Sequence, residues 1–415
     1  MGNRRLSLPS ISSPLTNISV LAGLLAGCFI VFVHRPEDSL AIAALEMILC
    51  LALPCALIEV LVNRSPQRAG INFSRRDFSL SRLVRKVIAL WAILAVLGFF
   101  YHAFAIYRSP FYAPFDWLWG VSIVPMLMLS LVYLAAVDMM QDEPNDALWQ
   151  LGNRFFSRPQ HLSAAEGNYL LGWLVKGFFF PLMFCYLCGQ IADLRQFDFS
   201  GFHSSSLRQF AGVSYDLLYI AFFFVDLMIS ATGYIMTFRL LGTHIRSVEP
   251  TVGGWLVAVA CYQPFYATLY TSYLGYEHGR PWGVLLSDQP ILYTVWGLMI
   301  VLCLSIYVWA AICFGIRFSN LTHRGIITTG PYRWTKHPAY ISKNISWWLV
   351  SIPFLPPDAS PWTAIRLCTG LLLINGLYFL RAKTEERHLL RDPVYREYAQ
   401  QVRDHGVFRR FRFGS

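Results

Sequence analysis

Long apolar stretches alternate with short polar segments along the whole chain. An α-helix needs about 20 mainly apolar residues to cross the hydrocarbon core of a bilayer, and ten stretches come close to that length or exceed it. None of the polar segments between them is long enough for a soluble domain. The stretches cover residues 15–34, 41–62, 87–107, 116–138, 168–191, 212–238, 253–275, 291–316, 339–355 and 363–380. This pattern predicts an all-α, polytopic integral membrane protein with about ten transmembrane helices.

The composition supports this prediction. Of the 415 residues, 55% are hydrophobic and only 14% are charged, and the mean hydropathy is +0.45. Soluble domains carry about 25% charged residues, and disordered chains are less apolar, so both classes are excluded. The nine cysteines lie within apolar stretches and do not indicate a secreted disulfide framework. Cys185 and Cys188 form a C-x-x-C pair without a second pair or a nearby His, so no metal site is predicted.

The positive charges indicate the orientation of the helices. If the N-terminus is cytoplasmic, 26 of the 34 Lys and Arg residues fall in cytoplasmic segments and 5 in external loops. Cytoplasmic loops of membrane proteins carry an excess of Lys and Arg, so both termini are expected in the cytoplasm. The net charge of +10 then reflects topology and attraction to anionic lipid, and no nucleic-acid partner is expected.

Several ionisable residues lie inside the apolar stretches. Such residues are candidates for function, because burying a charge in the bilayer without a partner is costly. Glu59 and Lys176 lie near the cytoplasmic face, where a side chain that reaches the interface explains them equally well. Asp226 is near mid-depth, with Lys176 or the hydroxyls of Thr232 and Tyr234 as expected partners. It is either part of a substrate pocket or a polar bridge between helices.

Two polar cassettes follow in the last third of the chain. The first cassette, residues 315–345, is basic and rich in Gly. The second cassette, residues 381–406, is charged and has a helical period. Only the short hairpin of the last two apolar stretches separates the two, so both lie on the same predicted face. They can therefore close over one polar ligand at the membrane surface.

The amino-acid sequences of both cassettes resemble those of a known family. Residues 330–340 read GPYRWTKHPAY, which resembles the GPYRxxRHPxY motif of the isoprenylcysteine carboxyl methyltransferase and phospholipid methyltransferase group. The residues Glu385 and Glu386, followed by Leu389, Tyr395 and Tyr398, resemble the tail motif of that group. The resemblance covers residues 290–415. It implies a membrane methyltransferase that uses S-adenosylmethionine and acts on a membrane lipid or on a prenylated small molecule or protein.

Two positions depart from the family pattern. Lys336 replaces the usual Arg before the His-Pro pair, which is a mild change. Residues 341–344, with the sequence ISKN, stand where many members have a Gly after the Tyr. This second departure changes the neighbourhood of the cofactor pocket or of the acceptor.

The residues of the first cassette suit the methionine end of the cofactor. Pro338 is compatible with the first turn of a helix, where free N–H groups and the helix dipole favour a carboxylate. Basic side chains just upstream add to that charge, and Glu385 is suited to a ribose hydroxyl, the amino group or the sulfonium. The alternative is a basic juxtamembrane turn that binds lipid phosphate. The residues assigned to the cofactor are Gly330, Tyr332, Arg333, Lys336, His337, Pro338, Tyr340 and Glu386.

Arg381 and Glu385 stand four residues apart on one helix. As an intrahelical ion pair they contribute only about 0.3–0.5 kcal/mol. The family resemblance implies that both are catalytic. Arg381 is suited to orienting an acceptor carboxylate, whereas Glu385 is suited to taking a proton from an amine or hydroxyl. The sequence leaves both chemistries open. Asp226, Arg246 and Asn344 are assigned to the acceptor pocket, and the loop 242–256 is either a connection or a cap over the site.

The chain divides into an N-terminal transmembrane region, residues 1–285, and a methyltransferase-like module, residues 286–415. The expected location is a bacterial inner membrane or the endoplasmic reticulum, with the active site facing the cytoplasm. Two alternatives remain. Membrane sterol reductases have a similar C-terminal architecture and use NADPH. A transporter or receptor is the other, although no internal repeat points to a midplane site.

Overall fold

The computed structural model describes residue 8 and residues 10–157, 161–275 and 281–410. Within these residues the regular secondary structure is helical apart from two antiparallel two-residue strands, β1 (Ser247–Val248) and β2 (Thr322–His323), and one isolated bridge. The predicted all-α class is therefore confirmed. The long helices are α1 (Pro14–Cys28), α2 (Leu40–Leu57), α4 (Leu80–Ala103), α5 (Ala113–Met140), α7 (Ala164–Arg195), α8 (Leu207–Ile235), α11 (Pro290–Phe314) and α13 (Pro361–Leu389). The shorter ones are α3 (Ser65–Arg68), α6 (Ala147–Asn153), α9 (Val252–Val259), α10 (Trp282–Leu285), α12 (Pro338–Ser351) and α14 (Pro393–His405).

Eight helices of the described chain are long and apolar enough to cross a membrane. They coincide with eight of the ten predicted stretches. The stretch 253–275 is instead divided between α9 and a π-helical segment, Ala267–Leu274. The stretch 339–355 forms α12, whose 14 residues rise about 21 Å, less than the ~30 Å hydrocarbon core. The count of about ten transmembrane helices stays a prediction.

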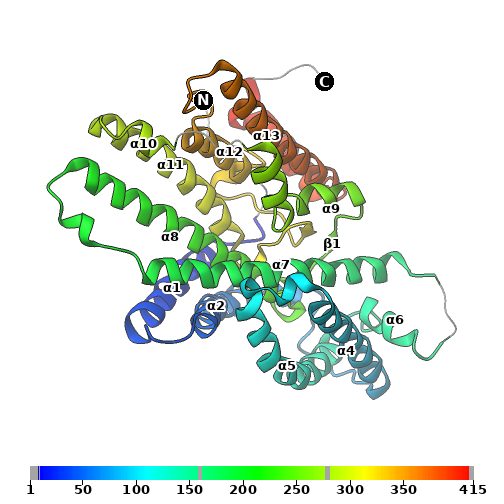
Figure 1. The fold of residues 1–415 in the computed structure, drawn as a ribbon. Helices are drawn as coiled ribbons and strands as arrows, with labels where there is room; N and C mark the ends of the chain where they lie inside the picture. The colour runs from blue at the N-terminus through cyan, green and yellow to red at the C-terminus, as the bar shows by residue number, and fades with distance from the viewer. Residues whose placement is uncertain (1–7, 9, 158–160, 276–280, 411–415) are drawn as a thin grey trace.

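Helices α8 and α11 pack side by side and run in the same direction. In the N-terminal halves of both helices, the Trp282 ring packs between Tyr215 of α8, at 4.7 Å between centroids, and Tyr293 of α11, at 4.6 Å. The connection between them, which contains α9, therefore returns from one end of the pair to the other. Helix α12 runs back along α11, and Trp296 Nε1 donates to the carbonyl of Leu349 at 2.8 Å. Figure 1 shows these elements grouped on one side of the molecule.

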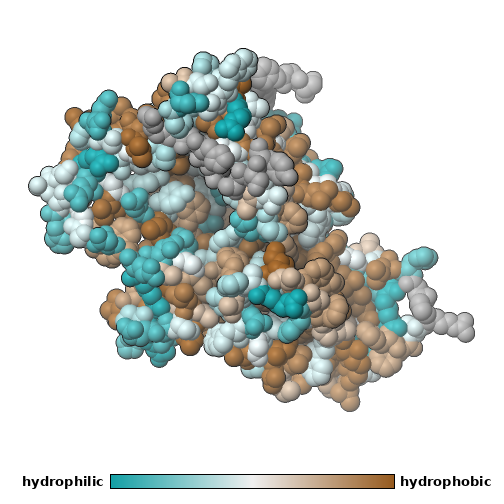
Figure 2. Space-filling model, viewed as in Figure 1, coloured by the Kyte–Doolittle hydropathy of each residue, from teal (hydrophilic) through white to brown (hydrophobic). Residues whose placement is uncertain are grey.

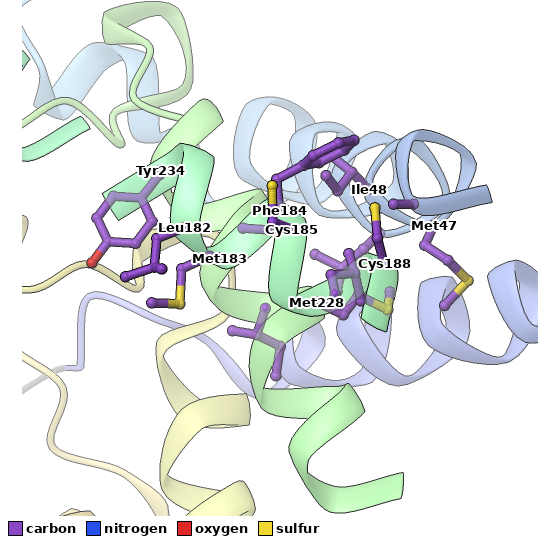
Figure 3. Packing of buried hydrophobic residues seen from close by; sticks show 14 of the residues in the cluster. Met47, Ile48, Leu182, Met183, Phe184, Cys185, Cys188, Met228 and Tyr234 are labelled. Atoms are coloured by element: carbon purple, nitrogen blue, oxygen red, sulfur yellow. The ribbon is translucent and has the colours of Figure 1, made fainter. Parts of the chain in front are cut away.

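The main core lies where α2, α7 and α8 meet (Figure 3). Met47 and Met228 are fully buried there, and Cys185 and Cys188 of α7 are buried free thiols in the same cluster. The C-x-x-C pair thus serves in helix packing, as expected. Apolar side chains also cover much of the surface around α4 and α5 in Figure 2, which suits helices in contact with lipid.

Buried ion pairs tie the helices together. Arg317, just after α11, makes two hydrogen bonds to the carboxylate of Glu59, with distances of 2.5 and 2.7 Å. Glu59 is fully buried, and its carboxylate is paired inside the protein, whereas a side chain that reaches the interface was one of the two interpretations of its sequence position. On α5, the buried Asp138 binds Arg82 at 3.1 Å and Lys86 at 3.1 Å. These pairs join α2 to the start of the first cassette and α4 to α5.

A single arginine fixes the first cassette to the end of α8. The guanidinium of Arg324 donates to the carbonyls of Gly233, Met236 and Thr243 at 2.6–2.8 Å. These acceptors include carbonyls at the C-terminal end of α8, where a cation is also favoured by the helix dipole. Arg324 is almost fully buried, and this burial lowers its pKa to about 9. The bend of the first cassette is therefore held from inside the bundle.

The two ends of the described chain lie beside the first cassette. The N–H of Ile11 donates to the carbonyl of Ile326 at 3.0 Å, and the N–H of Val407 donates to the carbonyl of Trp334 at 3.0 Å. Residues near both termini thus help to enclose the region where the cassettes meet.

Candidate active site

A cavity of about 160 Å³ lies where the two cassettes meet the ends of α8 and α11. Its wall is assembled from α8, α11, α12, α13, α14, residues 261–262 just after α9, and the chain between α11 and α12. Lys336, His337 and Tyr340 come from the first cassette, and Arg381 and Glu385 come from the second. The two cassettes thus enclose one space, as the sequence predicts. A polar wall of this kind suits a ligand with charged groups at one end.

The backbone before α12 is shaped by Gly and Pro. Gly330 has a φ of 60°, and a Cβ there would overlap with Cys313 Sγ. Pro338 occupies the first turn of α12, as predicted, and His337 is the N-cap residue. Among the described residues, no side chain caps this helix. The N–H groups of its first turn, next to the cavity-lining Ala339, are therefore available to an anion.

Glu386 holds the basic end of the first cassette. Its Oε1 lies 2.9 Å from His337 Nε2 and 2.7 Å from Lys336 Nζ. Lys383 approaches its other oxygen at 3.7 Å. Because this carboxylate is surrounded by partners, it orients Lys336 and His337. It does not line the cavity itself.

Glu385 faces the cavity and is bound by Tyr340. The Tyr340 hydroxyl donates to Glu385 Oε2 at 2.9 Å. The Tyr340 ring also stacks on the His337 ring, with 5.5 Å between centroids and an angle of 9°. Two consecutive glutamates thus bind the two stacked rings: Glu386 binds His337, and Glu385 binds Tyr340. This arrangement joins the two family motifs through side-chain contacts.

Arg381 does not pair with Glu385 in the structure. Its Nη2 donates to Asn320 Oδ1 at 2.6 Å and to the Tyr262 hydroxyl at 3.3 Å. The guanidinium carbon lies 5.2 Å from the centre of the Tyr340 ring and 5.8 Å from that of Tyr378. The intrahelical ion pair considered from sequence is therefore absent from the described contacts. Arg381 is instead held rigidly by an amide and an aromatic cage, which leaves Nε and Nη1 without a partner among the described residues.

Two histidines lie at the rim of the site. His323 of β2 lines the cavity, and its Nε2 is 3.3 Å from Asp392, the N-cap residue of α14. Burial lowers the pKa of His323 to about 4. The nearby Asp392 carboxylate raises this pKa, and the positive charge of Arg246 offsets part of that increase. The ring is therefore neutral at physiological pH. His388 of α13 lies 2.9 Å from the hydroxyl of Ser247 in β1.

The predicted site residues fall into two groups. Those that line the cavity are Asp226, Tyr332, Lys336, His337, Tyr340, Arg381 and Glu385. Those outside its wall are Arg246, Gly330, Arg333, Pro338, Asn344 and Glu386. Arg333 and Arg246 are exposed, and the backbone N–H of Arg246 pairs with His323. Asn344 accepts from Asn375 at 2.8 Å and thereby links α12 to α13. The binding roles given to these residues stay predictions.

The expected partners of Asp226 were wrong. Its Oδ2 accepts a 2.7 Å hydrogen bond from the hydroxyl of Tyr307 on α11. The Tyr234 hydroxyl is bonded to Asn320, and the Lys176 ammonium lies 3.3 Å from the centre of the Trp173 ring. Tyr307 belongs to a neighbouring helix 81 residues away, and its position along an apolar stretch gives no signal of this contact. Asp226 nevertheless lines the cavity, as proposed for a pocket residue.

The loop 242–256 is folded against the second cassette. Its strand β1 pairs with β2, and Glu249 is almost fully buried. Glu249 Oε1 accepts from Arg387 Nη2 at 3.3 Å. A second, smaller cavity beside it is lined by Glu249 together with Arg381 and Glu385. The loop is thus more than a solvated connection. Sequence reasoning also missed Asn320, Tyr262 and Lys343 in the main cavity.

Comparison with known proteins agrees with the motifs. No curated protein and no solved structure matches the chain. A family model matches residues 292–391, from the start of α11 to just after α13, and leaves out α14 with Tyr395 and Tyr398. That model is the isoprenylcysteine carboxyl methyltransferase (ICMT) family, and this match, together with the apolar helices, indicates a membrane methyltransferase.

Proposed function

We propose that the protein transfers a methyl group from S-adenosylmethionine to a lipidic or prenylated acceptor at the cytoplasmic face of its membrane. The observation that carries this proposal is the meeting of the two cassettes. His337 binds Glu386, Tyr340 binds Glu385, and both His337 and Tyr340 line one cavity with Arg381. S-adenosylmethionine supplies an electrophilic methyl group on a sulfonium centre.

The residues present fit such a cofactor. Lys336 and His337, beside the uncapped first turn of α12, suit the methionine carboxylate. Glu385 has one oxygen engaged by Tyr340 and offers the other to an amino group, a ribose hydroxyl or the sulfonium charge. Ile326 and Leu389 give the same cavity apolar walls that suit a purine ring. Glu386 acts indirectly, because it fixes the two basic side chains.

Arg381 and Glu385 are the groups suited to the acceptor. The rigid position of Arg381 favours alignment of an acceptor oxygen, and alignment is the main requirement of methyl transfer. The aromatic cage around Arg381 keeps water away from that position and leaves the nucleophile less solvated. Glu385 accepts the proton when the acceptor is an amine or a hydroxyl.

The charge pattern supports the proposed cytoplasmic orientation. The cassettes lie at the end of the bundle beside residues 8–11 and 407, and 26 of 34 Lys and Arg residues fall in the segments assigned to that face. Reporters fused after Ser415 and within residues 64–86 are expected to report cytoplasm, and a reporter within 356–361 the opposite side. An external C-terminal reporter would contradict the proposed location of the site.

Cofactor binding gives the direct test. Calorimetry on the purified protein in detergent is expected to show binding of S-adenosylmethionine and none of NADPH. His337→Ala and Glu385→Ala should each weaken binding about tenfold or more, because each removes one side of the stack. His405→Ala and Glu397→Ala, exposed on α14, are the matched controls. Binding of NADPH alone would favour a reductase instead.

The acceptor is sought in the host membrane. Lipid extracts of cells with and without the gene should differ by a species heavier by one methyl substitution, detected by mass spectrometry. Cells carrying Glu385→Ala should lack this species. A chain that binds S-adenosylmethionine but yields no methylated lipid or prenylated product would contradict the proposed acceptor class.

A further inference from the structure

The inner end of the cavity carries two opposite charges. Asp226 of α8 and Lys343 of α12 both line the cavity, with Tyr307 of α11 beside them. Asp226 lies nine residues before the end of α8, or about 14 Å along the helix axis. The cavity thus extends from the cassettes toward the depth of the membrane, where unpaired charges are costly.

Among the described residues, only one of the two oxygens of the Asp226 carboxylate accepts a hydrogen bond. Oδ2 accepts the hydrogen bond from Tyr307 at 2.7 Å. Oδ1 is buried and has no hydrogen-bond partner in the part of the chain that the structure describes, and the residue as a whole is 9% exposed. A carboxylate can accept several hydrogen bonds, and a buried acceptor that is left unmatched destabilises the fold. This oxygen therefore has the capacity for a donor from a ligand.

Lys343 is also incompletely matched. Its ammonium lies 5.3 Å from the centre of the Tyr307 ring and 5.5 Å from that of Trp347. Aromatic faces attract the charge but accept none of its N–H groups in a conventional hydrogen bond. Among the described residues, Lys343 forms no ion pair, with Asp226 or with any other carboxylate. Two opposite charges thus line one cavity without neutralising each other directly.

We propose that Asp226 and Lys343 form a subsite for a zwitterionic head group of the methyl acceptor. An ammonium of the acceptor binds the Asp226 carboxylate, and an anionic oxygen of the same head group binds the Lys343 ammonium. A ligand with both charges compensates both side chains, whereas an amine alone is repelled by Lys343 and an anion alone by Asp226. This inference rests on the proposed function and names the class of its acceptor.

The position of the two residues connects the subsite with the acceptor. Asp226 lies outside the segment 292–391 that matches the family model. Lys343 lies in residues 341–344, where the chain departs from the family motif. Both charges thus lie apart from the two motifs that carry the family resemblance. The methionine part of the methyl donor carries the same two charges, but its predicted contacts, Lys336 and His337, line the cavity just before the first turn of α12, whereas Lys343 lies within that helix.

The test compares three probes with the same alkyl chain. Dodecylphosphoethanolamine carries both charges, dodecylamine only the positive one and dodecyl phosphate only the negative. Binding is measured by calorimetry in phosphatidylglycerol nanodiscs, whose lipid offers no ammonium, with saturating S-adenosylhomocysteine. The wild-type protein is expected to bind the zwitterion at least tenfold tighter than either other probe. In Asp226→Asn, the affinity for the zwitterion should fall to the wild-type affinity for dodecyl phosphate. In Lys343→Gln, it should fall to the wild-type affinity for dodecylamine.

Controls separate the subsite from folding and from the methyl donor. Asp216→Asn, exposed on the same helix, should bind the zwitterion as the wild type does. Tyr307→Phe keeps both charges and should weaken zwitterion binding less than Asp226→Asn. Monodisperse elution and an unchanged melting temperature establish that each variant is folded. Affinity for S-adenosylhomocysteine should be the same in all variants.

Three outcomes would overturn the proposal. The first is equal affinity of the wild type for the three probes. The second is a preference for the zwitterion that survives both substitutions. The third is a loss of S-adenosylhomocysteine affinity in Asp226→Asn or Lys343→Gln, which would assign the charges to the methyl donor. If the wild type bound no S-adenosylhomocysteine at all, the proposed function would fail, and the comparison of probes would still test the charge subsite.

Discussion

The buried charges of this protein belong to two groups, which differ in how completely hydrogen bonds and opposite charges compensate them. Between the N-terminal helices and the start of the first cassette, Glu59 receives two hydrogen bonds from Arg317 and a further 2.5 Å bond from Ser65. At the inner end of the cavity, within the described part of the chain, Asp226 has one bond from Tyr307 and Lys343 has only aromatic faces. Matched charges hold elements together, whereas charges that the protein leaves open are available to a ligand. The state of its partners, more than burial, separates a structural charge from a binding charge.

The largest effect is expected when a matched pair is broken. Arg317→Met leaves the Glu59 carboxylate buried without its cation and should lower the free energy of unfolding by about 3–5 kcal/mol. Thermal unfolding in detergent measures this loss. The double variant Glu59→Gln/Arg317→Met removes both charges and should recover most of the stability. A single variant as stable as the wild type would show that the pair does not join α2 to the first cassette.

An intermediate effect is expected at His323 as a function of pH. Its folded pKa of about 4 lies below the ordinary value of 6.5, so the unfolded chain binds more protons between these values. The contribution of the neutral His323 ring to the free energy of unfolding is complete above pH 6.5. It is lost as the pH falls toward 4, and the loss is at most on the order of 3 kcal/mol. His323→Gln should flatten the decline of the melting temperature between pH 7 and 4.5, whereas the exposed His405→Gln should not. Equal slopes in wild type and His323→Gln would contradict the buried neutral ring.

A smaller effect, confined to activity, is expected at Arg381. Lysine cannot bind Asn320 and Tyr262 while offering further donors in one plane, so Arg381→Lys should reduce methyl transfer about tenfold or more. A tenfold loss corresponds to about 1.4 kcal/mol of transition-state stabilisation. Affinity for S-adenosylhomocysteine and the melting temperature should stay unchanged. Arg391→Lys, exposed on the same cassette, is the control. Full turnover in Arg381→Lys would leave Arg381 as a structural residue.

The smallest effect is expected on stability at the open charges. Asp226→Asn keeps the side-chain size and removes a carboxylate that is only partly matched. The free energy of unfolding should therefore stay within about 0.5 kcal/mol of the wild-type value or rise slightly. A loss comparable with that of Arg317→Met would show that Asp226 is a structural bridge, which was the alternative reading of its sequence position. Thermal unfolding of both variants under one condition decides between the two.

The apolar pattern predicted most of the helices because hydrophobic length alone determines them. It could not predict the form of residues 253–275, where α9 and a π-helical segment share a stretch that is apolar throughout. Nor did length reveal that α12 is short, since the stretch 339–355 extends beyond the last helical residue, Ser351. An apolar stretch indicates that a segment is buried, but it does not indicate the length of its helix. Both segments are partly buried against other helices, and neither forms a single long helix.

The candidate site was predictable where it depends on short motifs. The contacts of His337 with Glu386 and of Tyr340 with Glu385 join the two motifs that the sequence singled out. The surroundings of Arg381 were not predictable in the same way. Asn320 and Tyr262 lie 61 and 119 residues away from it, the first in the first cassette but outside its GPYR motif and the second in an apolar stretch. Only the packing of the segment after α9, the first cassette and α13 brings these side chains together.

The anchoring of the first cassette has a consequence for how the molecule can be divided. A fragment beginning near residue 286 would contain Arg317 and Arg324 and would keep the Phe318 carbonyl, which also accepts from Arg324. It would lose their other partners, namely Glu59, Ser65 and the carbonyls of Gly233, Met236 and Thr243. Two guanidinium groups would then face hydrocarbon or draw water into the bundle. The motifs of the last third can be recognised in isolation, but the segment that carries them cannot be transplanted without the helices that precede it.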